Sequence, residues 1–172
     1  MDHKLKLMVV DDSPLFRTWL IHSLSADDRF QVVGYAVNAL DAQEKIPLLQ
    51  PDMLTLDIEM PGMSGIDFLK QLLPVHPIPV ILVSSLNLRV FDALEAGAVD
   101  FVRKPDEANG LSKEIFLSML RSKLMVAAAS HVHLPSAPAD PQAGGIRKVS
   151  SLPPARNTFL QKPKIPLGAS PE

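Results

Sequence analysis

Short apolar runs alternate with amphipathic stretches along most of this chain. Five runs rich in leucine and β-branched residues stop at charged, hydroxyl-bearing or turn-forming residues, which is typical of short buried strands. The predicted strands are residues 4–10, 30–36, 53–56, 79–83 and 99–102. Apolar residues recur at helical spacing between and after them, so we predict helices over residues 14–24, 39–49, 65–73, 88–96 and 111–129.

Local start and stop signals agree with these helices. Ser13 can cap the first helix, and Pro14 suits its first position because the N–H that proline lacks would be unused there. Pro47 is expected to weaken the last turn of the second helix, and Gly97 lies where a C-terminal glycine cap belongs. Five strand–helix alternations with nearly continuous apolar strands predict an α/β fold, a five-stranded parallel, doubly wound sheet covered on both faces.

The end of the chain has a different composition. From residue 130 the helical periodicity is lost, and residues 135–145 are rich in proline, alanine and glycine. The last 48 residues hold 8 of the 16 prolines and a net charge of +3, whereas residues 1–124 carry a net charge of −5. Such a segment lacks the large apolar side chains that a core needs. We therefore predict an acidic domain over residues 1–125 and a flexible, disordered linker or tail over residues 126–172.

Composition also narrows the classes of function. The absence of cysteine excludes a disulfide framework, a thiolate zinc site and a cysteine nucleophile. No apolar run approaches the length of a membrane span or a signal peptide, so a cytoplasmic protein without membrane insertion is expected. Nucleic acid is not expected as the main partner, because phosphate binding needs a basic patch and the domain is acidic.

Polar residues stand at the carboxyl ends of the predicted strands, where ligands bind in an open parallel sheet. They are Asp11, Asp12, Asp57, Ser84 and Lys104. If the first and third strands are neighbours, three carboxylates share one pocket, and each like-charge pair costs about 4 kcal/mol at an effective dielectric constant near 20. A divalent cation together with one lysine would neutralise them, and the natural cation is Mg²⁺.

This set of groups suits phosphoryl chemistry. An aspartate at a strand end can attack phosphorus and form an aspartyl phosphate. Metal, lysine and hydroxyl would then each share the negative charge on the equatorial oxygens. ATP is not expected to be the direct donor, because the chain has no glycine-rich phosphate loop.

The order and spacing of these residues resemble a response-regulator receiver domain, over roughly residues 4–125. The family has a flavodoxin-like (βα)5 fold. The phrases LTLDIEMPGMSGIDFL, PVILVSSL and GAVDFVRKP are narrower still. They resemble the receiver half of the chemotaxis protein-glutamate methylesterase, the CheB type, in which a linker joins the receiver to a C-terminal hydrolase domain.

The resemblance assigns the reaction centre. Asp57 would be the phosphoacceptor and would receive the phosphoryl group from a phosphohistidine on a sensor histidine kinase. Asp12 would ligate Mg²⁺, with Asp11 helping directly or through water. The backbone carbonyl of Glu59 would complete the protein's share of the metal ligands.

The resemblance also assigns a switch. Lys104 would pair with the phosphoryl oxygens, and its peptide bond to Pro105 would be cis. Ser84 would move to hydrogen-bond the phosphoryl group, and Phe101 would turn inward in response. Phosphorylation would thereby bias a surface made by the fourth helix, fifth strand and fifth helix.

Two differences from the methylesterases limit which of that family's properties can be expected of this chain. Residues 84–97 are about one helical turn shorter than is usual there, which puts partner docking on that face in doubt. The catalytic serine of that family lies in a Gly-Ala-Ser-Thr-Gly-Gly phrase, which Ser170 matches over only three residues. His131 and His133 precede it and do not map to the family's histidine, so no esterase activity is expected from these residues.

Several readings stay open at this point. The expected partners are a histidine kinase and either a C-terminal methylesterase domain or a chemoreceptor array, with the chain a monomer or weak dimer. A stand-alone single-domain response regulator is the alternative. Two further classes fit the sequence less well. An aspartate-nucleophile phosphohydrolase would place its two acids in an Asp-x-Asp loop, and a flavin-binding protein would need a Ser/Thr-rich loop after the first strand; this chain has neither feature. An interaction module that no longer accepts phosphate would not need the complete set of polar residues.

Overall fold

A computed structural model describes residues 3–85 and 90–132 of the chain. Five strands form one parallel sheet in the order β2-β1-β3-β4-β5. This is one of the two common strand orders of doubly wound sheets. All strands are parallel, but the direction in which successive strands extend the sheet reverses between β1 and β3. The strands are β1 (Leu5–Val10), β2 (Phe30–Ala36), β3 (Met53–Asp57), β4 (Val80–Ser84) and β5 (Asp100–Arg103).

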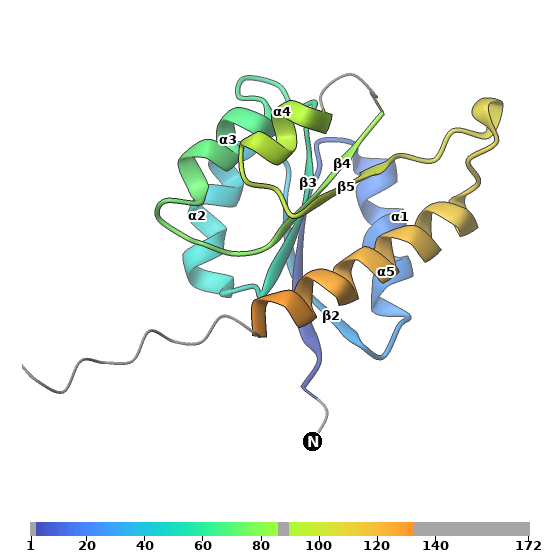
Figure 1. The fold of residues 1–172 in the computed structure, drawn as a ribbon, viewed down its shortest axis with the longest axis horizontal. Coiled ribbons are helices and arrows are strands. Elements are labelled where there is room, and N and C mark those ends of the chain that lie inside the picture. The colour runs from blue at the N-terminus through green and yellow to red at the C-terminus, as the bar shows by residue number, and fades with distance from the viewer. Residues whose placement is uncertain (1–2, 86–89, 133–172) are drawn as a thin grey trace, which may run out of the picture. The chain divides into compact units, whose positions relative to one another are not determined.

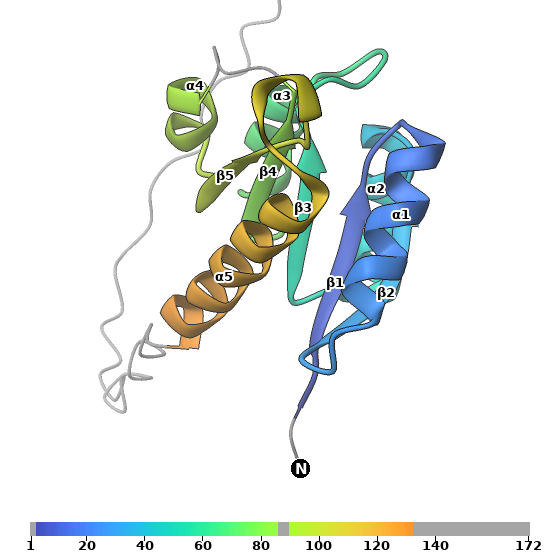
Figure 2. The ribbon, with the colours of Figure 1, turned by 90° about the vertical axis from the view of Figure 1, so that its right-hand side faces the viewer.

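Helices cover both faces of the sheet (Figure 1). On one side lie α2 (Ala39–Leu49), α3 (Gly65–Leu72) and α4 (Val90–Glu95). On the other lie α1 (Pro14–Ser25) and α5 (Lys113–Val132), and Figure 2 views the sheet from this side. A 3-10 helix, Glu107–Asn109, precedes α5. The predicted α/β class and the parallel, doubly wound sheet are confirmed.

Each face of the sheet has its own apolar core, because successive strand residues point to opposite faces. In β1, Met8 and Val10 pack under α2 and α3, whereas Leu7 and Val9 pack under α1 and α5. All four side chains are almost completely buried. The central strands are therefore apolar along their whole length, which is what made them recognisable in the sequence.

The local signals in the sequence act as expected. The Ser13 hydroxyl accepts a hydrogen bond of 3.4 Å from the N–H of Phe16, with Pro14 at the first position of α1. Gly97 has a φ of +103°, the left-handed conformation of a glycine after a helix. Helix α2 runs on past Pro47 to Leu49, because only the last turn is affected by the missing donor.

Element ends differ most around α5. The helix begins at Lys113 instead of residue 111, because Asp106 and Leu111 pair across a turn closed by Gly110, whose φ is +76°. It ends at Val132, three residues later than predicted and seven past the proposed domain boundary at residue 125. Residues 86–89, the proposed linker from residue 133 onward and Ser170 lie outside the described residues.

Candidate functional site

The predicted polar residues converge at one edge of the sheet. Asp11 and Asp12 follow β1, Asp57 is the last residue of β3, and Ser84 is the last residue of β4. Lys104 follows β5 directly. Because β1, β3, β4 and β5 are parallel neighbours, their carboxyl ends meet at the same edge. The condition set by the sequence, that β1 and β3 pair, is met.

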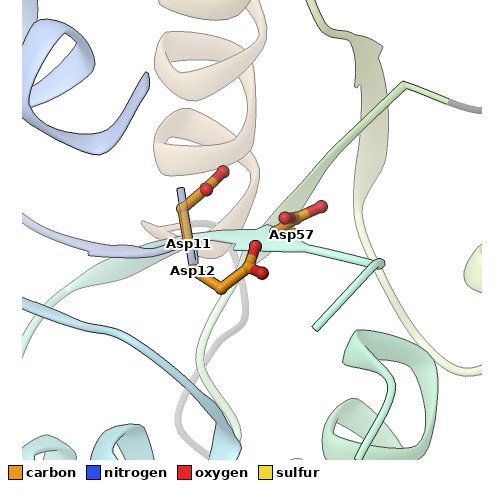
Figure 3. A group of neighbouring side chains, drawn as sticks. All are labelled: Asp11, Asp12 and Asp57. Atoms are coloured by element: carbon orange, nitrogen blue, oxygen red, sulfur yellow. The ribbon is translucent and has the colours of Figure 1, made fainter. Parts of the chain in front are cut away.

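The three carboxylates form a compact group (Figure 3). One oxygen from each of Asp11, Asp12 and Asp57 lies within 4.8 Å of the others. Asp11 and Asp57 are only 1% and 2% exposed, whereas Asp12 is open to solvent. A cation could reach the group from the side of Asp12 and contact all three.

Lys104 bridges the two buried carboxylates. Its Nζ lies 2.8 Å from Asp11 Oδ2 and 3.2 Å from Asp57 Oδ2. One ammonium therefore faces two carboxylates and can neutralise only one of them, and the carboxylate of Asp12 adds a further negative charge at the rim. The group carries three carboxylates against one lysine, an excess of negative charge that suits a divalent cation.

Backbone groups fix the orientation of both buried carboxylates. The N–H of Ser13 donates to Asp11 Oδ1 at 2.8 Å, and the N–H of Glu59 donates to Asp57 Oδ1 at 3.1 Å. Both oxygens of each carboxylate thus have a partner, with Lys104 on the second one. The Asp57 carboxylate is held in place before any ligand arrives, which is the preorganisation that a nucleophile needs.

Burial and charge act in opposite directions on these groups. Burial raises the pKa of Asp57 to about 7; Lys104 opposes this and Asp11 adds to it. Burial alone would lower the pKa of Lys104, but its hydrogen bond to Asp11 and the charges of both aspartates raise it above its usual value. Without a further cation, Asp57 therefore holds a proton for part of the time near neutral pH.

Gly65 lets helix α3 begin directly against the end of β3. Its N–H donates to the carbonyl of Ile58 at 2.8 Å. A Cβ at this position would lie 2.1 Å from the carbonyl oxygen of Asp57, which no side chain can do without moving the backbone. Glycine is thus required here by the close approach of two backbone segments.

The remaining predicted residues lie around this centre. Ser84 is fully buried, and its carbonyl accepts the N–H of Lys104 at 2.9 Å. Phe101 is half-buried and packs against the core under α2 and α3. Glu59 is exposed and turns its N–H to Asp57. The switch roles of Ser84 and Phe101 and the metal contact of the Glu59 carbonyl stay predictions.

The predicted cis peptide bond between Lys104 and Pro105 is wrong for this structure. No cis bond occurs in the described part of the chain, so this bond is trans. Trans is the favoured form of an X–Pro bond by about 0.5–1 kcal/mol.

The sequence did not indicate two further neighbours of the site, both on α1. Arg17 Nη1 donates to the backbone carbonyl of Asp11 at 2.8 Å. The ring of Phe16 lies 4.5 Å from Lys104 Nζ, measured to the ring centroid. Helical spacing places these residues in α1, but only the tertiary packing, in which α1 lies against β1 and β2, reveals which groups they contact.

Comparison with known proteins agrees with this geometry. The sequence profile described as the response regulator receiver domain matches residues 7–116. The chain belongs to this family. Its receiver domain is similar in structure to the response regulator domain of Thermotoga maritima CheB, with a TM-score of 0.66 and 36% identity over 74% of this chain and 98% of that one.

The receiver is also similar to the CheX-CheY-BeF3-Mg+2 complex from Borrelia burgdorferi, with a TM-score of 0.58 and 27% identity. That match covers 71% of this chain and 87% of the other.

Curated relatives are protein-glutamate methylesterase/protein-glutamine glutaminase proteins. The second such protein of Syntrophomonas wolfei is 45% identical over 75% of this chain and 38% of its own length. That of Thiobacillus denitrificans is 37% identical over 97% of this chain and 47% of its own length. The chain thus spans less than half the length of these relatives. Among the described residues, none of the helices is long and apolar enough to cross a membrane.

Proposed function

We propose that this receiver accepts a phosphoryl group on Asp57 from a phosphohistidine of a sensor histidine kinase, in a reaction that depends on Mg²⁺. One observation carries the proposal. Asp57 is a buried carboxylate held 3.2 Å from the Lys104 ammonium, with two further carboxylates whose oxygens lie within 4.8 Å. A structural ion pair would need the lysine but not the third carboxylate at the rim.

The donor set fits magnesium. Asp11, Asp12 and Asp57 would hold the ion, with the carbonyl of Glu59 as a further ligand, and these hard oxygen donors are what Mg²⁺ prefers. A related solved complex carries Mg+2 and BeF3 in its name. When bound, the ion would favour the ionised form of Asp57 and share the charge of the phosphoryl oxygens.

The transfer follows from the position of Asp57. An oxygen of its carboxylate attacks phosphorus, a P–O bond forms, and the P–N bond to the donor imidazole breaks. The donor ring, protonated at its other nitrogen, leaves with the electron pair of that bond and so ends as neutral imidazole. Lys104 contacts Asp57 Oδ2 before the transfer and exchanges this contact for one with a phosphoryl oxygen. The ammonium thereby stabilises the negative charge of the phosphoryl group as it moves onto the protein.

The relatives favour a regulatory role within a chemotaxis methylesterase. Their names describe methylesterase and glutaminase activities, and this chain corresponds to the smaller part of their length. We infer that the receiver is the regulatory half of such a protein and that phosphorylation acts through Ser84 and Phe101 on the surface around α4, β5 and α5.

The proposal is tested by a labelling assay in which the phosphoryl donor is either a histidine kinase carrying a radioactive phosphoryl group on its histidine, or radioactive acetyl phosphate. Wild-type chain is expected to become labelled with Mg²⁺ and not with EDTA, and Asp57→Asn should lose at least about 100-fold of the labelling rate because it removes the nucleophile. Asp28→Asn is the matched control, since Asp28 is a fully exposed aspartate. Equal labelling of Asp57→Asn and wild type would refute the proposal.

A further inference from the structure

One side of the Lys104 ammonium faces an aromatic ring. The Nζ atom lies 4.5 Å from the centroid of Phe16, within the range of a cation–π contact. Two carboxylate oxygens, of Asp11 and Asp57, occupy other sides of the same ammonium. The Lys104 side chain is only 14% exposed, so little of the ammonium remains for water.

The ring of Phe16 is itself held by two other rings. Its centroid lies 5.6 Å from that of Trp19, at an interplanar angle of 44°, and 5.8 Å from that of Phe116, at 65°. Trp19 and Phe116 are 5.9 Å apart, and Phe116 is completely buried. Such tilted and edge-to-face arrangements are the favoured ones for aromatic pairs. Helices α1 and α5 therefore fix Phe16 jointly.

The ring offers the ammonium something that a polar neighbour would not. Its attraction depends on the distance to the ring face and little on rotation of the three N–H groups. Lys104 can thus turn an N–H from a carboxylate oxygen to a phosphoryl oxygen without losing this contact. A hydrogen-bond acceptor at the same place would hold one N–H group in a fixed direction. Water at the same place would screen the attraction between the ammonium and the negative groups around it.

We propose that Phe16 is a positioning residue for phosphoryl transfer, its ring face holding the Lys104 ammonium beside Asp57. Phe16 touches neither the phosphoryl group nor the metal and acts through Lys104 alone. The inference rests on the proposed function of Asp57.

Substitution of the ring tests the role directly. Phe16→Leu keeps an apolar side chain but removes the π face, and it should slow labelling by acetyl phosphate about fivefold, a change of the size a cation–π contact gives. Phe16→Tyr retains the ring and should label within about twofold of wild type. In a Lys104→Met background the Phe16→Leu change should have no further effect, because the two residues act as one unit.

Ring fluorination separates the π face from packing, even if Phe16→Leu folds poorly. Fluorine withdraws charge from the ring face and barely changes its shape, so labelling should slow stepwise with one, two and three fluorines at Phe16. The same series at Phe116 is the matched control and should show no trend, since Phe116 touches the Phe16 ring, whereas within the described residues the cation–π partner of Lys104 is Phe16. A flat series at Phe16 would overturn the proposal.

A second readout needs neither phosphate nor metal. The ring current of Phe16 should shift the NMR signals of the Lys104 ε-methylene upfield in the Mg²⁺-free protein, and Phe16→Leu should return them to ordinary values. Unshifted signals in the wild type would also overturn the proposal. If Asp57 accepts phosphate but Phe16→Leu labels at the wild-type rate, only this inference fails; if wild type is never labelled, the proposed function fails with it.

Discussion

Two aspartate–base pairs in this domain have opposite electrostatic behaviour. Asp27, in the turn before β2, lies 2.6 Å from Arg29 at the surface, and the hydrogen bond from Arg29 lowers the pKa of its carboxyl to about 2. Asp57 also has a basic partner, Lys104 at 3.2 Å, yet burial raises its pKa to about 7. At Asp27 the basic partner decides the direction in which the pKa shifts. At Asp57 the loss of hydration and the second carboxylate decide it.

The difference indicates what each pair is for. The Asp27 carboxylate has two basic neighbours, Arg29 at 2.6 Å and Arg121 Nε at 3.4 Å, so its negative charge is balanced. The buried pair retains an excess of negative charge, so it remains ready for a cation or a phosphoryl group.

Removal of the basic partner should separate the two pairs most clearly. Lys104→Met leaves Asp11 and Asp57 buried without their shared cation and should lower the free energy of unfolding by about 3 kcal/mol at neutral pH. Arg29→Met should stay closer to wild type in stability, because Asp27 is less buried than Asp57 and keeps Arg121 Nε at 3.4 Å as a second partner. Urea unfolding of both variants checks this. Equal losses in the two variants would contradict the contrast.

The pH dependence should have opposite signs in the two pairs. The folded-state pKa of Asp57 is raised, so its contribution to stability is fully present below about pH 3.8 and is lost as the pH rises through about 7. When Mg²⁺ is absent, Asp57→Asn should therefore gain a few kcal/mol of stability relative to wild type as the pH rises from 4 to 8.

Asp27 is the counterpart in this titration. Its folded-state pKa is lowered, so its stabilisation is present above about pH 3.8 and is lost as the pH falls through about 2. Asp27→Asn should consequently be less stable than wild type at neutral pH and should match wild type only as the pH falls toward 2. Unfolding curves of the two variants across pH 2 to 8 check both signs, and parallel trends in the two variants would show that burial is not the deciding factor.

Magnesium should act on the buried group alone, with the smallest effect on stability. Binding to the folded state raises the unfolding temperature by mass action. The rise at a fixed Mg²⁺ concentration should be larger at pH 8 than at pH 6, because at pH 6 the ion must displace a proton from Asp57. Thermal unfolding with and without Mg²⁺ measures this. Asp27→Asn should respond like wild type, and a rise independent of pH would be inconsistent with metal binding at Asp57.

Much of this arrangement could be predicted from the sequence because local and long-range preferences agree. Residues 30–36 and 39–49 were predicted as strand and helix, and β2 and α2 have those same bounds. The site residues could be placed together because parallel strands bring their carboxyl ends to one edge.

Contacts made by tertiary packing could not be predicted in the same way. Phe16 is on α1 and Lys104 follows β5, so their contact exists only in the folded domain, and no short motif encodes that distance. The start of α5 was also missed, since the pairing of Asp106 with Leu111 across the turn at Gly110 competes with helix.

The central claim is that the buried, negatively charged pocket makes Asp57 the phosphoacceptor. Its most direct test is to phosphorylate the chain in Mg²⁺, reduce the acyl phosphate with borohydride and locate the resulting homoserine by mass spectrometry of peptides. Homoserine is expected at position 57 and not at position 27. Homoserine elsewhere, or a chain that stays unmodified under conditions that label a known receiver domain, would contradict it.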